Sequence, residues 1–352
     1  MKITSVFMIA VLAGWTSRAV AGTLVYIPQD TPNEVLVVDS ATDTVQGKIV
    51  GMGNVHGLSG TVDGKYLFAG SYDETTPDKS MPPKPKGVSE SDHKAHHAKR
   101  AETVTAKDGS LSYVSVIRVK DYSVVRRIAV PGAVHHAATT PDGRYAIMTH
   151  PNGDGISIID TDTFKVKKTV ATGPVPNYVA AGRDSKNIYV SNEGNNTISE
   201  VDTENWFVRR NILVGKSPEH LVISADGERL FVNNAGDGTV SVVSLRTGAV
   251  VKTYAIGGEV HGIDISDDGN TLYVAAKEKN QVVAIDLETG KMRATALSPS
   301  PYHLTVIRGT GKIYVSSADK PKIWVVGQRD LRLEGEIPIR GTGHQMVVGQ
   351  NR

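Results

Sequence analysis

The chain has 352 residues, of which 39 are Lys or Arg and 37 are Asp or Glu, so its formal net charge is +2. Apolar residues make up 39% and charged residues 22%, a balance that excludes both a disordered chain and a protein with many membrane spans. Cysteine is absent, which excludes disulfides, thiolate metal ligands, iron–sulfur clusters and cysteine nucleophiles.

Residues 1–21 have the pattern of a secretory signal peptide. Lys2 precedes an apolar stretch over residues 3–15, and Ala19-Val20-Ala21 stands directly before Gly22. We expect cleavage after Ala21, a periplasmic or secreted location, and no stable membrane insertion of the mature protein. Cleavage removes two cations and no acid, leaving 37 of each sign. A neutral chain has no electrostatic footprint for nucleic acid, so no nucleic-acid partner is expected.

A sequence repeat of about 42 residues organises the remainder of the chain. One string combines an apolar stretch, an acidic-glycine turn and a strand, as in VHGLSGTVDGKYLFAG from Val55 and VHGIDISDDGNTLYVAA from Val260. A second β-rich run ends 42 residues apart each time, at Arg118, Asp160, Asp202, Ser244 and Asp286. Each repeat holds four short β-rich runs and no helical periodicity, which predicts four-stranded propeller blades.

An insertion interrupts the first full repeat at residues 75–110. The interval from Asp39 to Arg118 is 79 residues, one repeat plus 37. Its Pro, Lys, Ser and Glu content predicts an exposed, flexible loop. The spacing of His93, His96 and His97 would suit a metal ion if they lay on a short helix, but a solvated loop without metal is the favoured interpretation.

The two ends of the mature chain complete one further blade. Residues 23–50 supply three strand-like runs, and GHQMVVGQ from Gly343 supplies one. Residues 22–352 are therefore predicted to form an all-β, seven-bladed β-propeller with four antiparallel strands per blade. The ring would close by pairing of the N- and C-terminal strands in one blade, since an unpaired edge strand is a liability.

The strands IYVSN at Ile188, LYVAA at Leu272 and IYVSS at Ile313 each follow a tight turn of this kind. In these strands the chain resembles the YVTN-type seven-bladed β-propeller family. The resemblance spans essentially the whole mature chain. It implies a fold and not a function, because this propeller carries many unrelated activities.

One position of the repeat, seven residues before the turn acid, is rich in histidine. Around the ring this position holds His56, His135, Asn177, Glu219, His261, Tyr302 and His344. The next residue in each repeat is Gly57, His136, Tyr178, His220, Gly262, His303 and Gln345. Because innermost propeller strands surround the axis, these residues are expected to meet at one mouth of the channel.

These histidines predict a metal or cofactor site. We expect His56, His135 and His344, from three successive blades, to form a three-imidazole face, with His261 and Glu219 approaching from the other side. These five residues are the predicted metal ligands, and copper is preferred among the metals that suit neutral imidazole. A second set is predicted to bind the cofactor: His136, His220 and His303. Alternatively, all of them bond backbone carbonyls and fill the mouth.

The general layout is similar to that of the propeller domain of nitrous oxide reductase, which holds a histidine-ligated copper cluster near the axis. The cysteine-ligated copper domain of that enzyme has no counterpart in this cysteine-free chain, so the resemblance implies a metal site and not the same reaction. Haem d1-binding propellers are a looser parallel. They imply a haem-type tetrapyrrole, held by an axial histidine, as the alternative cofactor.

The sequence thus predicts an exported propeller that binds copper, or a metal-bearing cofactor, at a histidine-lined channel mouth. If it is an enzyme, redox chemistry at that metal is expected, with a redox or assembly protein of the periplasm as its partner. One alternative is a non-catalytic scaffold for protein interactions. Another is a lyase or lactonase, but such propellers hold a divalent ion with carboxylates, and Glu219 is the one acid at the two repeat positions.

Overall fold

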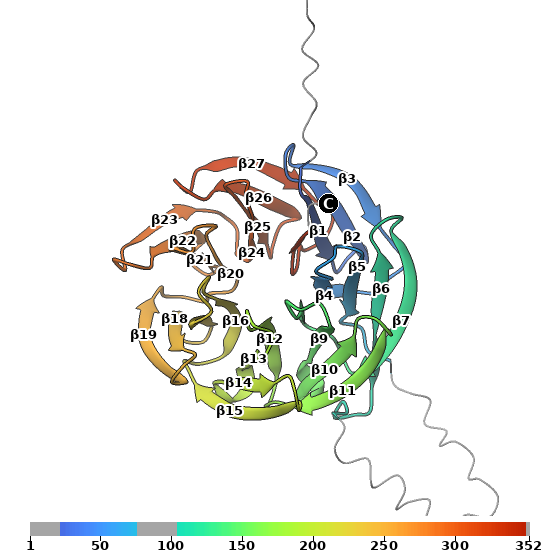
Figure 1. The fold of residues 1–352 in the computed structure, drawn as a ribbon. Coiled ribbons are helices and arrows are strands. Elements are labelled where there is room, and N and C mark those ends of the chain that lie inside the picture. The colour runs from blue at the N-terminus through green and yellow to red at the C-terminus, as the bar shows by residue number, and fades with distance from the viewer. Residues whose placement is uncertain (1–21, 76–103, 350–352) are drawn as a thin grey trace, which may run out of the picture.

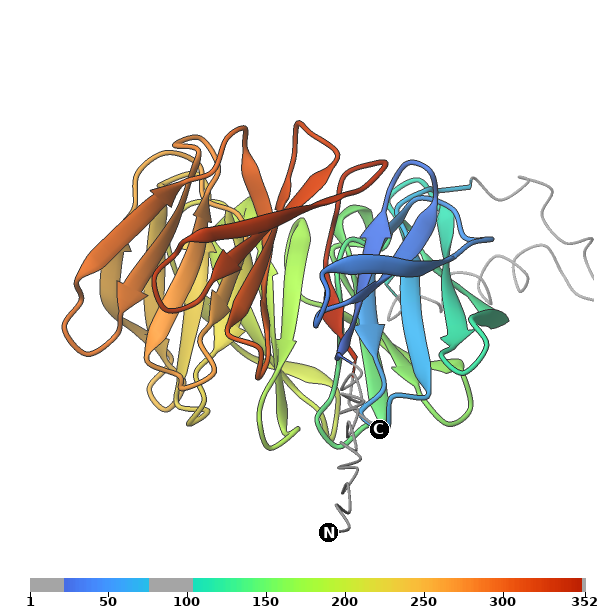
Figure 2. The ribbon, with the colours of Figure 1, turned by 90° about the horizontal axis from the view of Figure 1, so that it is seen from above.

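The computed structural model describes residues 22–75 and 104–349, which form seven four-stranded antiparallel sheets arranged in a ring (Figure 1). Figure 2 shows the same ring from its edge, with the sheets packed side by side around the axis. The predicted seven-bladed propeller is confirmed. The signal peptide predicted for residues 1–21 lies outside the described residues, as do His93, His96 and His97 of the insertion.

Within the first six blades, four strands run outward from the axis in chain order. Blades 1 and 2 comprise β4 (Val55–Gly60), β5 (Tyr66–Ser71), β6 (Leu111–Arg118) and β7 (Ser123–Pro131), then β8 (Ala137–Thr139), β9 (Tyr145–His150), β10 (Gly155–Asp160) and β11 (Lys165–Ala171). Blades 3 and 4 comprise β12 (Pro176–Ala181), β13 (Asn187–Asn192), β14 (Thr197–Asp202) and β15 (Phe207–Leu213), then β16 (Pro218–Ile223), β17 (Arg229–Asn234), β18 (Thr239–Ser244) and β19 (Ala249–Ala255). Blades 5 and 6 comprise β20 (Ile263–Ile265), β21 (Thr271–Ala276), β22 (Gln281–Asp286) and β23 (Met292–Ala296), then β24 (Pro301–Ile307), β25 (Lys312–Ser317), β26 (Lys322–Gly327) and β27 (Leu333–Pro338).

Two three-residue 3-10 turns, η1 (Pro151–Gly153) and η2 (Glu193–Asn195), are the helical elements of the described ranges. In these ranges no helix has the length and apolar character needed to cross a membrane.

Blade 7 closes the ring with strands from both ends of the chain. Its order from the axis is β28 (Val347–Val348), β1 (Leu24–Gln29), β2 (Glu34–Asp39) and β3 (Thr44–Ile49). Val25 pairs with Val348 and Tyr26 with Val347, and the Gly349 N–H donates to the Leu24 carbonyl at 2.7 Å. The predicted closure is confirmed, and β1 does not present an open edge to the axis.

Apolar side chains fill the seven interfaces between neighbouring blades. Strand β1 illustrates the pattern, because successive side chains of a strand point to opposite faces. Val25 and Ile27 pack against blade 6, while Tyr26 packs against blade 1. Each of the seven interfaces has its own cluster of buried apolar residues. No blade buries both of its faces alone, so the ring is stabilised as a unit.

The acidic-glycine turns end the innermost strands at the face opposite their first residues. In blade 1, Oδ1 of Asp63 accepts hydrogen bonds from Thr61 Oγ1 at 2.7 Å and from the Lys65 N–H at 3.1 Å. Equivalent backbone bonds are accepted by Asp142, Asp184, Asp226 and Asp268. These acids therefore shape turns, as short polar side chains commonly do, and they leave the other face of the ring for the histidines.

Ring closure can be tested by truncation. Removing residues 341–352 deletes β28 and the buried Met346 side chain and leaves β1 unpaired on its inner side. We expect the free energy of unfolding in urea to fall by at least about 3 kcal/mol, since burial of one large apolar side chain alone contributes about 1.5–3 kcal/mol. The matched control, removal of residues 350–352 only, should unfold like the full chain. Equal stability of both truncations would contradict a stabilising role for β28.

Candidate metal centre

Seven histidine side chains gather at one mouth of the ring, where the innermost strands begin. This histidine cluster consists of His56, His135, His136, His220, His261, His303 and His344. Contacting imidazole centroids lie between 3.9 Å apart, for His56 and His344, and 5.9 Å apart, for His56 and His303. The structure thus brings together, from six blades, all the histidines that the repeat positions singled out.

A β-bulge at the start of the innermost strand directs two successive side chains toward the axis. The pairing of β4 with β5 shifts between Val55 and Leu58, and β12, β16 and β24 shift at equivalent places. In blade 2, the Thr149 carbonyl accepts from the His135 N–H at 3.1 Å, and the Thr149 N–H donates to the His136 carbonyl at 3.0 Å. Two residues opposite one is the mark of a bulge, which re-aims side chains. Neighbours His135 and His136 therefore both join the cluster.

His136, His220 and His303 form the most deeply buried part of the cluster and are termed the inner triad. Their exposed fractions are 0%, 3% and 2%. Ring centroids lie 4.8 Å apart for His136–His220 and His220–His303, and 5.6 Å apart for His136–His303. One nitrogen of each ring lies within 4.8 Å of the other two. The Nε2 atoms of all three are buried and have no hydrogen-bond partner among the described residues.

Contacts around the inner triad hold the His136 ring and the backbone of two of its members. Nδ1 of His136 lies 2.9 Å from the Asn177 carbonyl oxygen, which can only accept, so Nδ1 carries the proton and Nε2 a free lone pair. The backbone N–H groups of His136 and His303 donate to Thr149 Oγ1 at 2.9 Å and Ser316 Oγ at 3.1 Å. The bond from Nδ1 orients the His136 ring for metal binding, because a partner on the far nitrogen fixes both the tautomer and the ring orientation.

His56, His135 and His344, termed the outer set, complete two further groups with metal-binding dimensions. His56 combines with His135 and His136 in one group, and with His344 and His303 in the other. Each of these two groups therefore includes one residue of the inner triad, and His56 belongs to both groups. In the predicted three-imidazole face, the His56 ring contacts both others, with centroids 4.5 Å from His135 and 3.9 Å from His344. His135 and His344 nevertheless belong to different groups.

Glu219 contacts the seventh histidine. Its Oε2 lies 2.6 Å from Nδ1 of His261, whose ring stacks on Tyr302 with centroids 3.9 Å apart. Burial raises the pKa of Glu219 to about 7 and lowers the pKa of His261 well below its usual range. A carboxylate on the far nitrogen of an imidazole is a common support for a histidine ligand. The structure therefore gives Glu219 a contact with His261, and its predicted role as a metal ligand stays a prediction.

Burial keeps the clustered imidazoles neutral. Loss of solvent is the largest cause of a lowered pKa in six of them, followed in each by repulsion from nearby imidazoles or Lys277: His56, His135, His136, His220, His261 and His303. The pKa of His135 is lowered to about 3. At pH 7 these rings carry no charge, so their lone pairs are free to bind a metal ion.

Three residues of the site had no role assigned from the sequence. Tyr178, with its ring 4.6 Å from that of His136, and Gln345 both occupy the repeat positions, so the alignment of repeats could have assigned them. Gln345 Nε2 donates to the Ala137 carbonyl at 2.7 Å, which ties blade 7 to blade 2, its neighbour but one. The ring centroid of Tyr72 lies 5.3 Å from that of His56. Tyr72 follows β5, outside the two repeat positions that hold the histidines.

A buried histidine outside the cluster shows what a structural imidazole looks like in this protein. Nδ1 of His150 lies 3.1 Å from the Ala133 carbonyl oxygen, and its Nε2 lies 2.8 Å from Ser157 Oγ. Both nitrogens are bonded, and burial lowers its pKa to about 4. The free nitrogens of the inner triad are therefore a property of the cluster and not of buried histidines in general.

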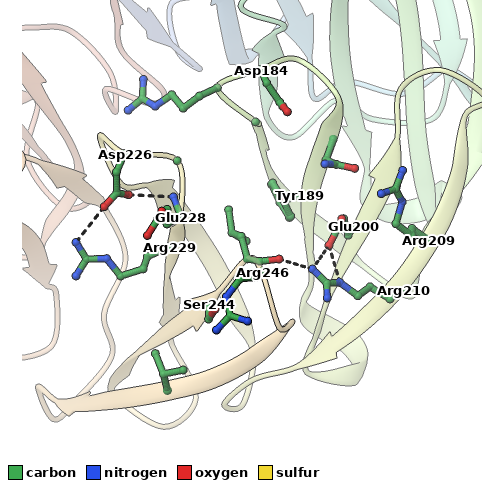
Figure 3. A pocket seen from close by; sticks show the side chains of 16 residues that line it. Asp184, Tyr189, Glu200, Arg209, Arg210, Asp226, Glu228, Arg229, Ser244 and Arg246 are labelled. Carbon is green, nitrogen blue, oxygen red and sulfur yellow. Dashed lines mark hydrogen bonds and ion pairs between the residues drawn. The ribbon is translucent and has the colours of Figure 1, made fainter.

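A separate cavity of about 790 Å³ lies between blades 3 and 4, toward the opposite face (Figure 3). Five arginines line it, and so do four acids: Asp184, Glu200, Asp226 and Glu228. Arg210 pairs with Glu200 at 2.6 Å and Arg229 with Asp226 at 3.6 Å. The lining charges nearly balance, so the histidine cluster is the stronger candidate site.

A family described as "Lactonase, 7-bladed beta-propeller" matches residues 145–259, less than half of the chain. No curated protein matches the chain. The matched family supports a propeller family in general, and the resemblance to the YVTN-type family stays a prediction.

Solved structures resemble the chain in fold. Hydrazine synthase of Kuenenia stuttgartiensis has a TM-score of 0.67 at 15% identity, covering 92% of this chain and 100% of that one. A periplasmic gluconolactonase of Pseudomonas aeruginosa has a TM-score of 0.70 at 13% identity, covering 93% and 99%. Dihydro-haem d1 dehydrogenase, in complex with a ligand abbreviated DHE, has a TM-score of 0.64 at 13% identity, covering 91% of this chain but 65% of that one. At such identities the similarity concerns the fold alone.

The role of the bulge glycine in blade 1 can be tested with Gly57→Ala. A Cβ at Gly57 would lie 2.9 Å from the His135 carbonyl oxygen and the His136 Cα. We expect a loss of about 1–3 kcal/mol in unfolding free energy, the usual cost of overpacking. The control Gly335→Ala, where nothing lies within 4 Å of the new Cβ, should stay within about 0.5 kcal/mol. Equal effects in urea unfolding would contradict close packing of blade 2 on Gly57.

Acid should destabilise the metal-free protein. Histidines with lowered pKa values stay neutral in the folded state, while the unfolded chain takes up protons near pH 6.5. Stability is therefore full above pH 6.5 and falls as pH drops toward 3, by about 1.4 kcal/mol per pH unit for each such group. Glu219, with its raised pKa, acts in the opposite direction but is one group against six.

The measurement is urea unfolding at pH 7.5, 6.5 and 5.5. His135→Ala should reduce the slope below pH 6.5. A free energy of unfolding that stays constant from pH 7.5 to 5.5 would mean that the imidazoles are not held neutral.

Proposed function

We propose that this protein is an exported β-propeller that binds transition-metal ions, copper preferred, in the histidine cluster. The observation that carries the proposal is the convergence of buried, unpartnered imidazole nitrogens at one mouth of the ring. A buried polar atom without a partner costs about 1–3 kcal/mol. The inner triad has three such atoms, the Nε2 atoms of its rings. One nitrogen of each ring lies within 4.8 Å of one nitrogen of the other two, so one metal ion can be shared by the three rings.

The donor set favours copper. The three groups consist entirely of histidine, the chain contains no cysteine, and neutral imidazole suits copper, zinc, iron and nickel. Copper binds such sites most tightly among the divalent first-row metals. Magnesium and calcium prefer oxygen ligands and are disfavoured here.

The number of histidines favours more than one ion. A single tetrahedral ion takes four protein ligands at most, and the cluster offers seven imidazoles. Any two of the three groups have one residue in common, which is His56, His136 or His303, so ions bound in them would be close neighbours.

Copper held by imidazole can exchange one electron with a partner. We therefore infer redox chemistry as the reaction class, with a redox or assembly protein of the periplasm as the partner.

A tetrapyrrole is the alternative cofactor, supported by the fold similarity to dihydro-haem d1 dehydrogenase. The packing of the rings argues against it. The inner imidazoles contact one another at centroid distances of 4.8–5.6 Å, so a planar macrocycle could reach only the outer residues.

A lactonase is the second candidate function, favoured by the matched family and by the fold similarity to a periplasmic gluconolactonase. The periplasmic location of that protein also fits the export signal predicted here. Glu219, with its pKa raised to about 7 beside His261, could serve as a general base in lactone hydrolysis. A non-catalytic scaffold would use neither the metal nor this pair.

Elemental analysis of protein purified from the periplasm without an affinity tag tests the proposal. We expect copper at one or more equivalents per chain, and a loss of most of it after combined His56→Ala, His136→Ala and His303→Ala substitution, which removes two ligands from each of the three groups. His150→Ala, which removes a buried histidine outside the cluster, should keep the copper. Far-UV circular dichroism confirms that each variant is folded.

Folded protein that holds no transition metal and takes up no added copper or zinc would contradict the proposal. Hydrolysis of a sugar lactone by that metal-free protein, lost on Glu219→Gln, would establish the lactonase instead. Absence of both metal and turnover would leave the scaffold.

A further inference from the structure

We propose that the cluster contains two classes of metal site, of which the inner triad binds the first copper ion tightly and the outer set holds a later, exchangeable ion. This inference rests on the proposed function, because it ranks sites within the same histidine cluster. It assigns different tasks to histidines that the repeat makes equivalent.

The inner triad is gathered at the axis before a metal ion binds. Its rings are at most 3% exposed, and their Nε2 atoms have no hydrogen-bond partner in the described structure. One nitrogen of each ring lies within 4.8 Å of the other two. The Asn177 carbonyl fixes the tautomer of His136, and hydroxyl groups hold the backbone of His136 and His303. A site whose ligand rings are already buried side by side loses less conformational freedom on binding than one that must be assembled, which raises affinity.

Competition for shared ligands separates the two classes. Each imidazole nitrogen binds one ion, and the two mixed groups need His136 or His303 to be complete. Once an ion occupies the inner triad, those nitrogens are taken. A second ion then has His56, in contact with His135 on one side and His344 on the other. It is left with fewer protein ligands than the first ion and completes its coordination with water.

The outer set lies slightly nearer the solvent than the inner triad. His135 is partly exposed, and His56 is 8% exposed against 0% for His136. An ion with few protein ligands and an open position is the kind that exchanges and accepts an external ligand. We therefore assign the outer set to metal uptake and ligand binding, and the inner triad to permanent retention.

Titration of the metal-free protein with Cu²⁺ in competition with nitrilotriacetate tests this order. All proteins carry alanine at positions 93, 96 and 97, so that the histidines of the insertion contribute nothing. The matched pair is His220→Ala in the inner triad and His344→Ala in the outer set, since both side chains are buried to a similar degree. His150→Ala is the control, and His303→Gln is the second inner variant should His220→Ala fail to fold.

We expect the parent protein to bind a first ion at least about tenfold more tightly than a later one, since even outer-shell support changes affinity by about 10–100-fold. His220→Ala should weaken the first ion by at least about 100-fold, because a ligand itself is lost. His344→Ala should leave the first ion within about threefold and weaken the later one by about 10–100-fold. Electron paramagnetic resonance of the first equivalent should show nitrogen couplings that persist in His344→Ala.

A single affinity class, or a first ion weakened as much by His344→Ala as by His220→Ala, would overturn the ranking while leaving copper binding intact. Failure of the parent protein to bind Cu²⁺ at all would instead overturn the proposed function. The two failures are therefore distinguishable in one titration.

Discussion

The architecture of the site depends on one geometric constraint: seven sheets packed around an axis must bring the first residues of their innermost strands together. The bulge at this point lets each strand contribute two side chains instead of one, because it turns neighbours such as His135 and His136 toward the same centre. Residues far apart in sequence thereby become neighbours at centroid distances of 3.9–5.9 Å. The close contacts of Gly57 with blade 2 and of Gly262 with blade 6 are part of the same packing, since neither leaves room for a Cβ.

The histidine cluster lowers the stability of the folded protein, and the rest of the ring compensates for this loss. Buried imidazole nitrogens without a protein partner disfavour folding, and protonation would disfavour it further, as the lowered pKa of His135 indicates. Seven apolar interfaces between the blades, and the closure of β1 on β28, supply the stability that tolerates it. His150 shows that the fold can satisfy both nitrogens of a buried histidine where no ligand is needed.

Much of this was predictable from the sequence because it depends on periodicity. The 42-residue step gives the blade count, the split blade gives the closure, and the histidine positions follow from the repeat. The grouping was not predictable: the contact partner of Glu219 and the division of His56, His135 and His344 between two groups depend on bulge geometry and side-chain torsions, which no repeat encodes. Tyr72 was missed because it lies at the end of a second strand, outside the repeat position that marks the others.

The most direct test of metal binding at the axis is X-ray diffraction from crystals of the natively purified protein, recorded on both sides of the copper absorption edge. We predict an anomalous difference peak on the axis, within bonding distance of the Nε2 atoms of His136, His220 and His303. A map without such a peak, in which those nitrogens bond to ordered water or to one another, would contradict the account.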